Sequence, residues 1–139
     1  MTNIYSGQCI CQNVACEIRL PQRLQTYSAR ACDCEFCQAR GINYLSAPSA
    51  EITITTNSDL QVLQQGSMQA SFLTCRECNL IIAVTVQTEL SYIGALNSEI
   101  LEAKALLLPP TVASPKLLSA DEKLARWQKV WAPIKMQIR

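Results

Sequence analysis

Alternating apolar and polar side chains predict strands over most of the chain. Between Val14 and Leu20 every second side chain is apolar, and Glu17 and Arg19 occupy positions between them. Because successive side chains of a strand point to opposite faces, this segment is predicted to bury one face and expose the other. Cys16 lies on the apolar face, so we interpret it as a small hydrophobic core residue.

Shorter runs with the same signals predict further strands, bounded by turn-forming residues. They are expected at 4–7, 25–31, 43–47, 51–55, 61–65, 69–74, 80–86 and 92–96. The strands on either side of Gly66 are predicted to form a hairpin. The run at 80–86 is the most apolar, which indicates a strand buried on both faces, and the run at 92–96 is expected to pair with it.

Two helices are predicted, one short and one near the C-terminus. The short helix covers 35–40 and ends at Gly41, because glycine favours the left-handed conformation found after helices. The second begins with a capping box at Ser119 and runs to about Trp131. An apolar stripe predicts that this helix docks on the sheet, with binding to a partner as the alternative. The stripe consists of Leu124, Trp127, Val130 and Trp131.

The length of 139 residues indicates a single domain at 1–139, and the predicted strands place its core at about 4–100. Residues 108–115 are rich in proline and are expected to be a stiff connector. The C-terminal extension beyond it carries the helix at about 119–131. With 49% hydrophobic and 17% charged residues, the chain can bury a core. The fold class is therefore mainly β.

Charge and hydropathy exclude two classes of partner. A net charge of +1 gives no electrostatic footprint for nucleic acid. The longest apolar runs, at 80–84 and 106–110, are too short to span a bilayer, so no membrane partner is expected. The first residues lack the basic start and apolar run of a signal peptide, so we expect a cytoplasmic location.

Seven of the eight cysteines fall in three tight clusters. A disulfide within Cys-x-Cys would be strained, and disulfides are rare in the cytosol, so these spacings favour a metal. Thiolates are soft ligands that select zinc or iron, and zinc is the commoner ion in such sites. The clusters are a Cys-x-Cys pair at Cys9 and Cys11, a triad at Cys32, Cys34 and Cys37, and a Cys-x-x-Cys pair at Cys75 and Cys78.

Counting ligands predicts two zinc ions per chain, one structural and one catalytic or labile. A structural zinc is closed by four protein ligands, whereas a catalytic zinc keeps one position open. The two cysteine pairs make a closed four-thiolate site, and the triad makes a site with an open position. We therefore place the catalytic function at the triad, together with Asp33 inside it. The alternative is a second structural zinc completed by water, Cys16 or a carboxylate such as Asp33 or Glu35.

These motifs resemble those of the glutathione-dependent formaldehyde-activating enzymes, a family related to the centromere protein V domain. The family patterns Gly-x-Cys-x-Cys-Gly-x-Val, Cys-His-Cys-x-x-Cys and Phe-Cys-x-x-Cys-Gly correspond here to 7–14, 32–37 and 74–79, and a Gly-x-Leu-Asp element corresponds to 94–97. The likeness covers about residues 5–100. It implies small antiparallel sheets stapled by zinc, a fold of the β-tent type. It also implies a structural zinc on the outer four cysteines and a catalytic zinc on the triad that meets the thiol of glutathione.

The resemblance implies a carbon–sulfur lyase like S-(hydroxymethyl)glutathione synthase, which condenses glutathione with formaldehyde or cleaves their adduct. Asp33 stands where the family has histidine, Gln12 and Asn79 stand where it has glycine, and the chain contains no histidine. Proton transfer would therefore use Asp33, Glu35, Glu77 or a metal-bound water. The alternative is a non-catalytic binding module that is stabilised by zinc and has kept the family fold.

Glutathione carries two carboxylates, which require cationic or hydrogen-bonding partners. Arg30, Arg40 and Arg76 lie close to the cysteine clusters in sequence and are candidates for that role. Charge balance for the electron-rich thiolate sites, or simple exposure to solvent, is the alternative. The sequence therefore assigns no glutathione pocket to them.

Overall fold

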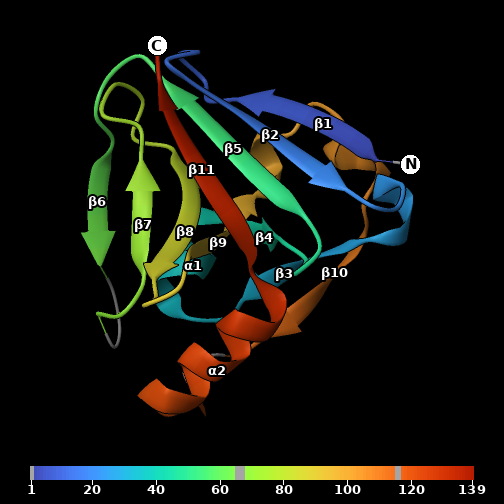
Figure 1. Ribbon diagram of the computed structural model, residues 1–139, viewed down its shortest axis with the longest axis vertical. Helices are drawn as coiled ribbons and strands as arrows, with labels where there is room; N and C mark the ends of the chain where they lie inside the picture. The colour runs from blue at the N-terminus through green and yellow to red at the C-terminus, as the bar shows by residue number, and fades with distance from the viewer. Residues whose placement is uncertain (1, 65–67, 115–116) are drawn as a thin grey trace.

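The computed structural model describes residues 2–64, 68–114 and 117–139 (Figure 1). Its helices are α1 (Glu35–Arg40) and α2 (Ala120–Val130), with short 3-10 turns η1 (Leu24–Thr26), η2 (Ser98–Ile100) and η3 (Lys104–Leu106). Its strands are β1 (Asn3–Gln8), β2 (Val14–Leu20), β3 (Ser28–Cys32), β4 (Asn43–Leu45), β5 (Glu51–Thr56), β6 (Gln61–Gln64), β7 (Ser71–Thr74), β8 (Ile81–Gln87), β9 (Tyr92–Asn97), β10 (Leu108–Ala113) and β11 (Ala132–Ile138). The chain is mainly β, as the alternating pattern predicts.

The strands form one mixed sheet with the order β1-β2-β5-β11-β9-β4-β3-β10. A branch of β8, β7 and β6 continues from β9. β11 runs parallel to β5 and β10 runs parallel to β3, whereas the other described strand pairs are antiparallel. The expected set of small antiparallel sheets is therefore wrong in this respect. Both parallel pairs join segments that are far apart in the sequence, which local patterns do not relate.

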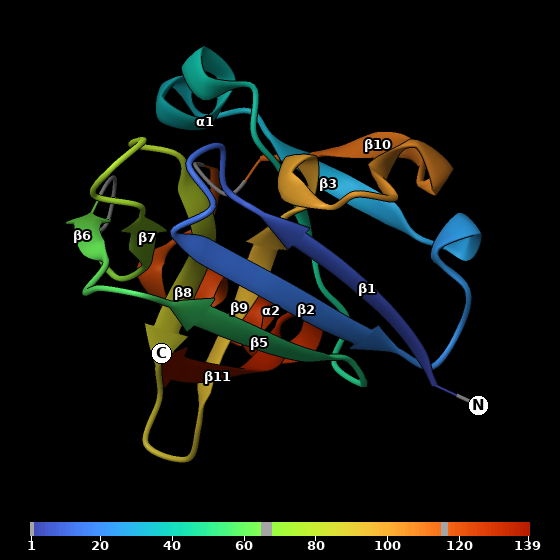
Figure 2. The ribbon, with the colours of Figure 1, turned by 90° about the horizontal axis from the view of Figure 1, so that it is seen from above.

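The apolar core lies where β1, β2, β5 and β11 cross in front of β9, β4 and β3 (Figure 1). Ile18 of β2 and Ile54 of β5 belong to one cluster with Leu45 of β4 and Leu96 of β9, and all four are fully buried. Cys16 is 5% exposed in the same cluster, as the alternation predicts. Seen from above, α1, β3 and β10 lie on the side away from β5 and β11 (Figure 2).

Most local predictions hold in the structure. The strands β2, β5, β8 and β9 cover the predicted segments, and β8 pairs with β9. α1 ends at Gly41, whose φ is 62°, and Ser119 forms the predicted capping box with Glu122. The segment 25–31 differs, because its start belongs to η1 and the strand begins only at Ser28. β6 and β7 pair as the predicted hairpin requires, although Gly66 itself lies outside the described residues.

The segment after residue 107 departs from the prediction in two ways. The expected connector contains the edge strand β10, and the register of β10 against β3 shifts between Leu108 and Thr111, where the two prolines fall. An edge strand tolerates proline at such an irregularity; Pro115 lies outside the described residues. β11, which has no counterpart among the predicted strands, lies between β5 and β9. The C-terminal segment is therefore part of the sheet, and the core extends beyond residues 4–100.

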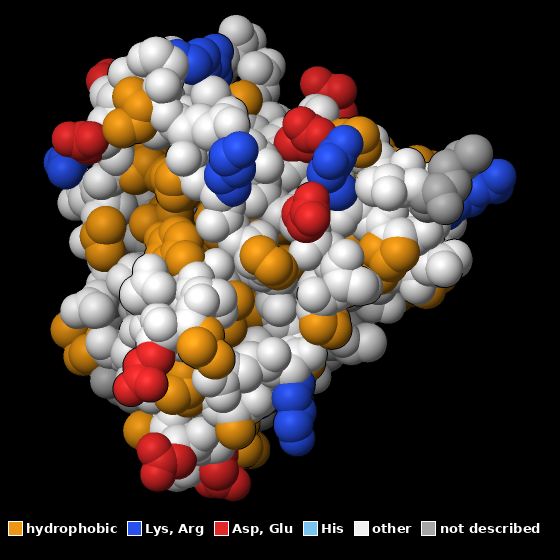
Figure 3. Space-filling model, in the orientation of Figure 1, with side chains coloured by type: hydrophobic (Ala, Val, Ile, Leu, Met, Phe, Trp, Pro, Cys, Tyr) orange, Lys and Arg blue, Asp and Glu red, His pale blue; other side chains and the backbone are white. Residues whose placement is uncertain are grey.

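The helix α2 packs on the sheet through the predicted stripe. Trp127 stacks on Trp131 with ring centroids 4.6 Å apart, and Trp131 is 7% exposed. The Ser46 hydroxyl donates a hydrogen bond of 2.7 Å to the carbonyl of Val130, which fixes the end of the helix. Within the described ranges, no helix is long and apolar enough to cross a membrane. Lysine and arginine side chains are scattered over the face seen in Figure 3 rather than gathered in one patch.

Candidate metal centres

Two turns bring the outer cluster together, which we define as Cys9, Cys11, Cys75 and Cys78. The first pair lies in the β1–β2 turn and the second in the β7–β8 turn. All four sulfurs lie within 4.8 Å of one another, and Cys11 Sγ is 3.6 Å from the sulfurs of both Cys9 and Cys75. Zinc–sulfur bonds of about 2.3 Å in a tetrahedron separate sulfurs by about 3.8 Å. The outer cluster therefore has the size and chemistry of a closed zinc site.

Backbone and amide groups support these sulfurs. The Val14 N–H donates to Cys9 Sγ at 3.4 Å, and the Asn13 side-chain amide donates to Cys75 Sγ at 3.9 Å. Partial burial raises the pKa of Cys78, but hydrogen bonds from the backbone N–H groups of Cys11 and Leu80 outweigh it and lower the pKa to about 7. Donors of this kind stabilise thiolates and orient them towards a common ion.

Both turns of the outer cluster need left-handed backbone. Gln12 has a φ of 67° and Asn79 has a φ of 62°, and these are the positions where the resembled family carries glycine. Asparagine tolerates this region better than most residues, whereas glutamine has no such advantage. Both turns therefore adopt left-handed backbone without glycine, at a cost in backbone strain at Gln12.

We expect Gln12→Gly to raise the free energy of unfolding by about 1 kcal/mol, because removing Cβ relieves left-handed strain that exceeds the entropy cost of glycine. Denaturant unfolding in buffer with a fixed zinc concentration measures this change. Asn79→Gly is the matched control and should gain less, because asparagine is already tolerated there. A loss of stability in Gln12→Gly would contradict the strain that we assign to this turn.

The inner triad, which we define as Cys32, Cys34 and Cys37, forms where β3 runs into α1. Cys32 ends the strand, Cys34 is the N-cap of the helix, and Cys37 lies in the first turn. The three sulfurs lie within 4.8 Å of one another, and those of Cys32 and Cys34 are 3.4 Å apart. The Cys34 sulfur accepts a hydrogen bond from the Cys37 N–H at 3.4 Å. This strand–turn–helix geometry therefore presents all three sulfurs to one point.

The thiols of the inner triad also change one another's acidity. A hydrogen bond from Cys37 lowers the pKa of Cys32 to about 6, and the same interaction raises the pKa of Cys37. The inner triad thus carries thiolate character near neutral pH, and thiolate is the form that binds soft metal ions.

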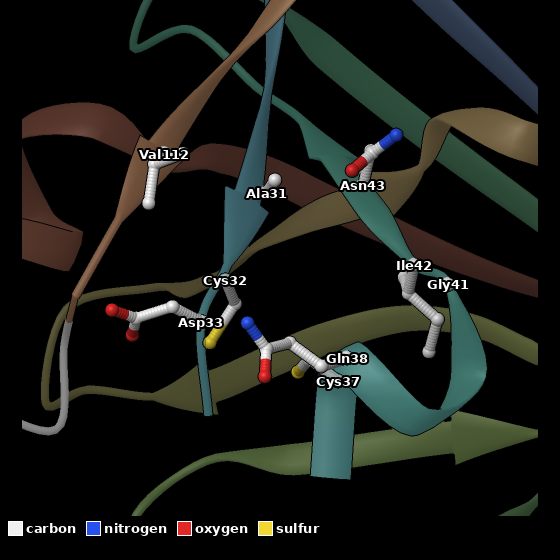
Figure 4. A pocket seen from close by; sticks show the side chains of 9 residues that line it. All are labelled: Ala31, Cys32, Asp33, Cys37, Gln38, Gly41, Ile42, Asn43 and Val112. Carbon is white, nitrogen blue, oxygen red and sulfur yellow. The ribbon is translucent and has the colours of Figure 1, made fainter. Parts of the chain in front are cut away.

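A pocket of about 470 Å³ opens beside the inner triad (Figure 4). Its lining is Ala31, Cys32, Asp33, Cys37, Gln38, Gly41, Ile42, Asn43 and Val112. Figure 4 shows the Gln38 side chain reaching from α1 towards Cys32 and the Asp33 carboxylate turned away from both sulfurs. Asp33 accepts a hydrogen bond from the Ser114 hydroxyl. A ligand in this pocket would therefore meet sulfur and carboxamide groups first.

The described residues place no fourth cysteine, histidine or carboxylate ligand atom in the cluster of the inner triad. Cys16 lies in the core on β2, where burial raises its pKa to about 12. Glu35 is exposed on α1, and Glu77 lies in the turn of the outer cluster. Cys16, Asp33 and Glu35, the protein ligands suggested as alternatives for closing this site, therefore lie outside the cluster of the inner triad, and Glu77, suggested for proton transfer, lies beside the outer cluster.

The candidate arginines have other contacts. Arg30 donates to the Ser46 hydroxyl, Arg40 lies over the Phe36 ring at 3.7 Å, and Arg76 donates to the Asp59 carbonyl at 3.2 Å. Arg40 and Arg76 are exposed, as the solvent alternative expects, whereas Arg30 is half-buried; none of the three lines the pocket beside the inner triad.

Sequence reasoning missed Tyr44, which is part of the inner site. Its hydroxyl lies 3.6 Å from Cys37 Sγ, and the side chain is 7% exposed. Burial, followed by the nearby Cys37 sulfur, raises the pKa of Tyr44. The sequence signals only a strand at this position, because contact with Cys37 arises when β4 passes beside α1. Asn43, also on β4, was missed for the same reason, whereas Gln38 lies on the predicted helix but carries no metal-ligating group that would single it out.

Fold and site together define a mainly β domain with two groups of cysteines that can hold metal ions, one closed by four thiols and one with three. The chain is similar to a crystal structure of a Rhodobacter sphaeroides protein, with 27% sequence identity and a TM-score of 0.57. The likeness covers 76% of this chain and 99% of the other. No family model and no curated protein matches the sequence.

Proposed function

We propose that this protein binds two zinc ions and uses the inner triad to join or separate a small thiol and an aldehyde. The supporting observation is that Cys32 and Cys37 line a pocket, while the described residues offer no fourth ligand of the usual kinds in their cluster. Three protein donors leave a coordination position for a ligand from solution. The activity would resemble that of S-(hydroxymethyl)glutathione synthase, a carbon–sulfur lyase.

The reaction combines R–SH with R′–CHO to give R–S–CH(OH)–R′. One carbon–sulfur bond forms, and the thiol proton ends on the former carbonyl oxygen; the reverse direction breaks the same bond. Zinc at the inner triad would lower the pKa of a bound thiol, so that the nucleophilic thiolate is present near neutral pH.

The pocket residues supply orientation rather than proton transfer. The carboxamides of Gln38 and Asn43 can donate and accept hydrogen bonds and so orient polar groups of the thiol. Ile42 and Val112 provide apolar walls. The Asp33 carboxylate accepts a hydrogen bond from Ser114 and points away from the sulfurs, so we expect water in the open pocket rather than Asp33 to take the thiol proton.

We expect micromolar protein to accelerate exchange between formaldehyde and its glutathione adduct by roughly 10-fold, because a free thiol is only a few per cent thiolate at neutral pH and zinc would hold a bound thiol as thiolate. Two-dimensional exchange NMR at neutral pH measures this rate directly. Cys16→Ala is the matched control, because it removes a buried cysteine outside both clusters and should leave exchange unchanged. Equal exchange with and without the wild-type protein would contradict the assignment to formaldehyde and glutathione.

One observation favours the second candidate, a zinc-stabilised binding module without catalysis. Within the described lining of the pocket there is no lysine or arginine to meet the carboxylates of glutathione. Repeating the exchange measurement with 2-mercaptoethanol separates the two candidates, because this thiol carries no charge. Acceleration with the uncharged thiol supports an enzyme for small thiols. Acceleration with neither thiol supports the module.

A further inference from the structure

Tyr44 stands directly behind the inner triad. It belongs to the short strand β4, pairs with Arg30 of β3, and reaches the Cys37 sulfur with its hydroxyl at 3.6 Å. Both side chains are almost completely buried, at 7% and 2% exposure. Water therefore has little access to this contact. Breaking the hydrogen bond to sulfur would leave a buried hydroxyl without a partner, which costs free energy.

The ring of Tyr44 is held by its surroundings. It lies in an apolar cluster separate from the main core, together with Phe72 of β7 and Ile93 of β9. β4 is itself held on both sides, because Tyr44 also pairs with Asn97 of β9. The direction of the hydroxyl is therefore set by packing before any metal binds, as expected for a group that orients a metal ligand.

The Tyr44 hydroxyl contacts Cys37, but Tyr44 is not among the residues that line the pocket. Cys37 and Gln38 line the pocket, whereas Tyr44 does not. The hydrogen-bonding contact of the hydroxyl within the inner site is with the Cys37 sulfur, so we expect it to act on a bound metal through that sulfur.

We propose that Tyr44 is a positioning residue whose hydroxyl donates to the Cys37 sulfur and tunes the inner metal centre alone. The inference rests on the inner metal site of the proposed function. A hydrogen bond to thiolate withdraws electron density from sulfur and fixes its direction. A metal ion held by the inner triad would receive less electron density from the Cys37 sulfur and would therefore lower the pKa of an incoming thiol more strongly.

Tyr44→Phe keeps the ring and removes only the hydroxyl. We expect this variant to bind cobalt(II) at the inner triad about 10-fold more weakly, the lower end of outer-shell effects, with the outer cluster unchanged. We also expect the sulfur-to-cobalt charge-transfer band of the inner centre to move to lower energy, because the sulfur becomes more electron-rich. Competition titration and absorption spectra measure both quantities. A merely structural tyrosine would not move this band.

Tyr92→Phe is the matched control, because the Tyr92 hydroxyl donates its hydrogen bond to Thr85, at 2.9 Å, and not to a cysteine. It should leave both affinities and the spectrum unchanged. An unchanged spectrum and affinity in Tyr44→Phe would overturn the inference and leave the proposed function intact. Complete loss of the inner cobalt would also overturn it, because Tyr44 would then be a ligand. A wild-type protein that binds one cobalt would overturn the inference and the proposed function together.

Discussion

Cys75→Ser is expected to unfold most of the protein at room temperature. Cys75 is fully buried, and the outer cluster ties the β1–β2 turn to the β7–β8 turn. Structural zinc sites contribute about 10–16 kcal/mol of apparent binding free energy, which matches or exceeds the whole stability of a small domain, about 5–15 kcal/mol. Losing one of four ligands removes much of this energy. Circular dichroism and thermal melts, together with zinc analysis, measure the loss.

Cys16→Ala is the control for this variant, because it also changes a buried cysteine of the same core. It leaves a small cavity and should cost about 1 kcal/mol without changing the zinc content. A Cys75→Ser protein that melts like Cys16→Ala would show that the outer cluster contributes no metal-dependent stability.

The second large effect is expected in Cys34→Ser, which should lower the zinc content from about two ions to about one per chain and abolish accelerated exchange. The fold should remain, because Cys34 is the N-cap of α1 and its side chain accepts from the Cys37 N–H. Serine is a preferred N-cap and can accept the same hydrogen bond. The substitution therefore removes a metal ligand while keeping the helix.

Zinc analysis after gel filtration and a thermal melt test this expectation. Glu35→Gln is a suitable control, because Glu35 is exposed in the same turn and makes no part of the cluster. Unfolding of Cys34→Ser would assign a structural role to the inner triad and favour the binding module.

Local features of the fold could be predicted because each depends on neighbours in sequence. The alternation in β2, the glycine that ends α1 and the capping box at Ser119 need no distant partner. β11 and β10 could not be predicted in the same way, because their parallel pairing with β5 and β3 depends on tertiary contacts. Pro109 and Pro110 also prevent the prediction of β10, since proline in a run of residues argues against a strand.

In the candidate site, too, the features that depend on sequence neighbours could be predicted, and those that depend on tertiary contacts could not. The spacing of the cysteines predicts the two pairs and the triad, and counting ligands predicts that the two pairs share one cluster, as the structure has it. Asn43 and Tyr44 both come from β4: folding places Asn43 in the pocket lining and brings the Tyr44 hydroxyl to the Cys37 sulfur. The orientation of Asp33 depends on Ser114, which follows β10. Sequence motifs of a few residues cannot predict these contacts, because the partners are far apart in the chain.

The central place of β11 has a consequence for synthesis on the ribosome. The strands β1, β2 and β5 are synthesised before β9, and in the sheet β5 is connected to β9 through β11, at 132–138. Until 132–138 emerge, the nascent polypeptide holds two partial sheets with unpaired edges facing each other, an arrangement that invites aggregation. The cysteines of the β1–β2 turn and of the β7–β8 turn are both synthesised before β11. A metal ion bound by these four thiols can therefore hold the two partial sheets together until β11 pairs with both.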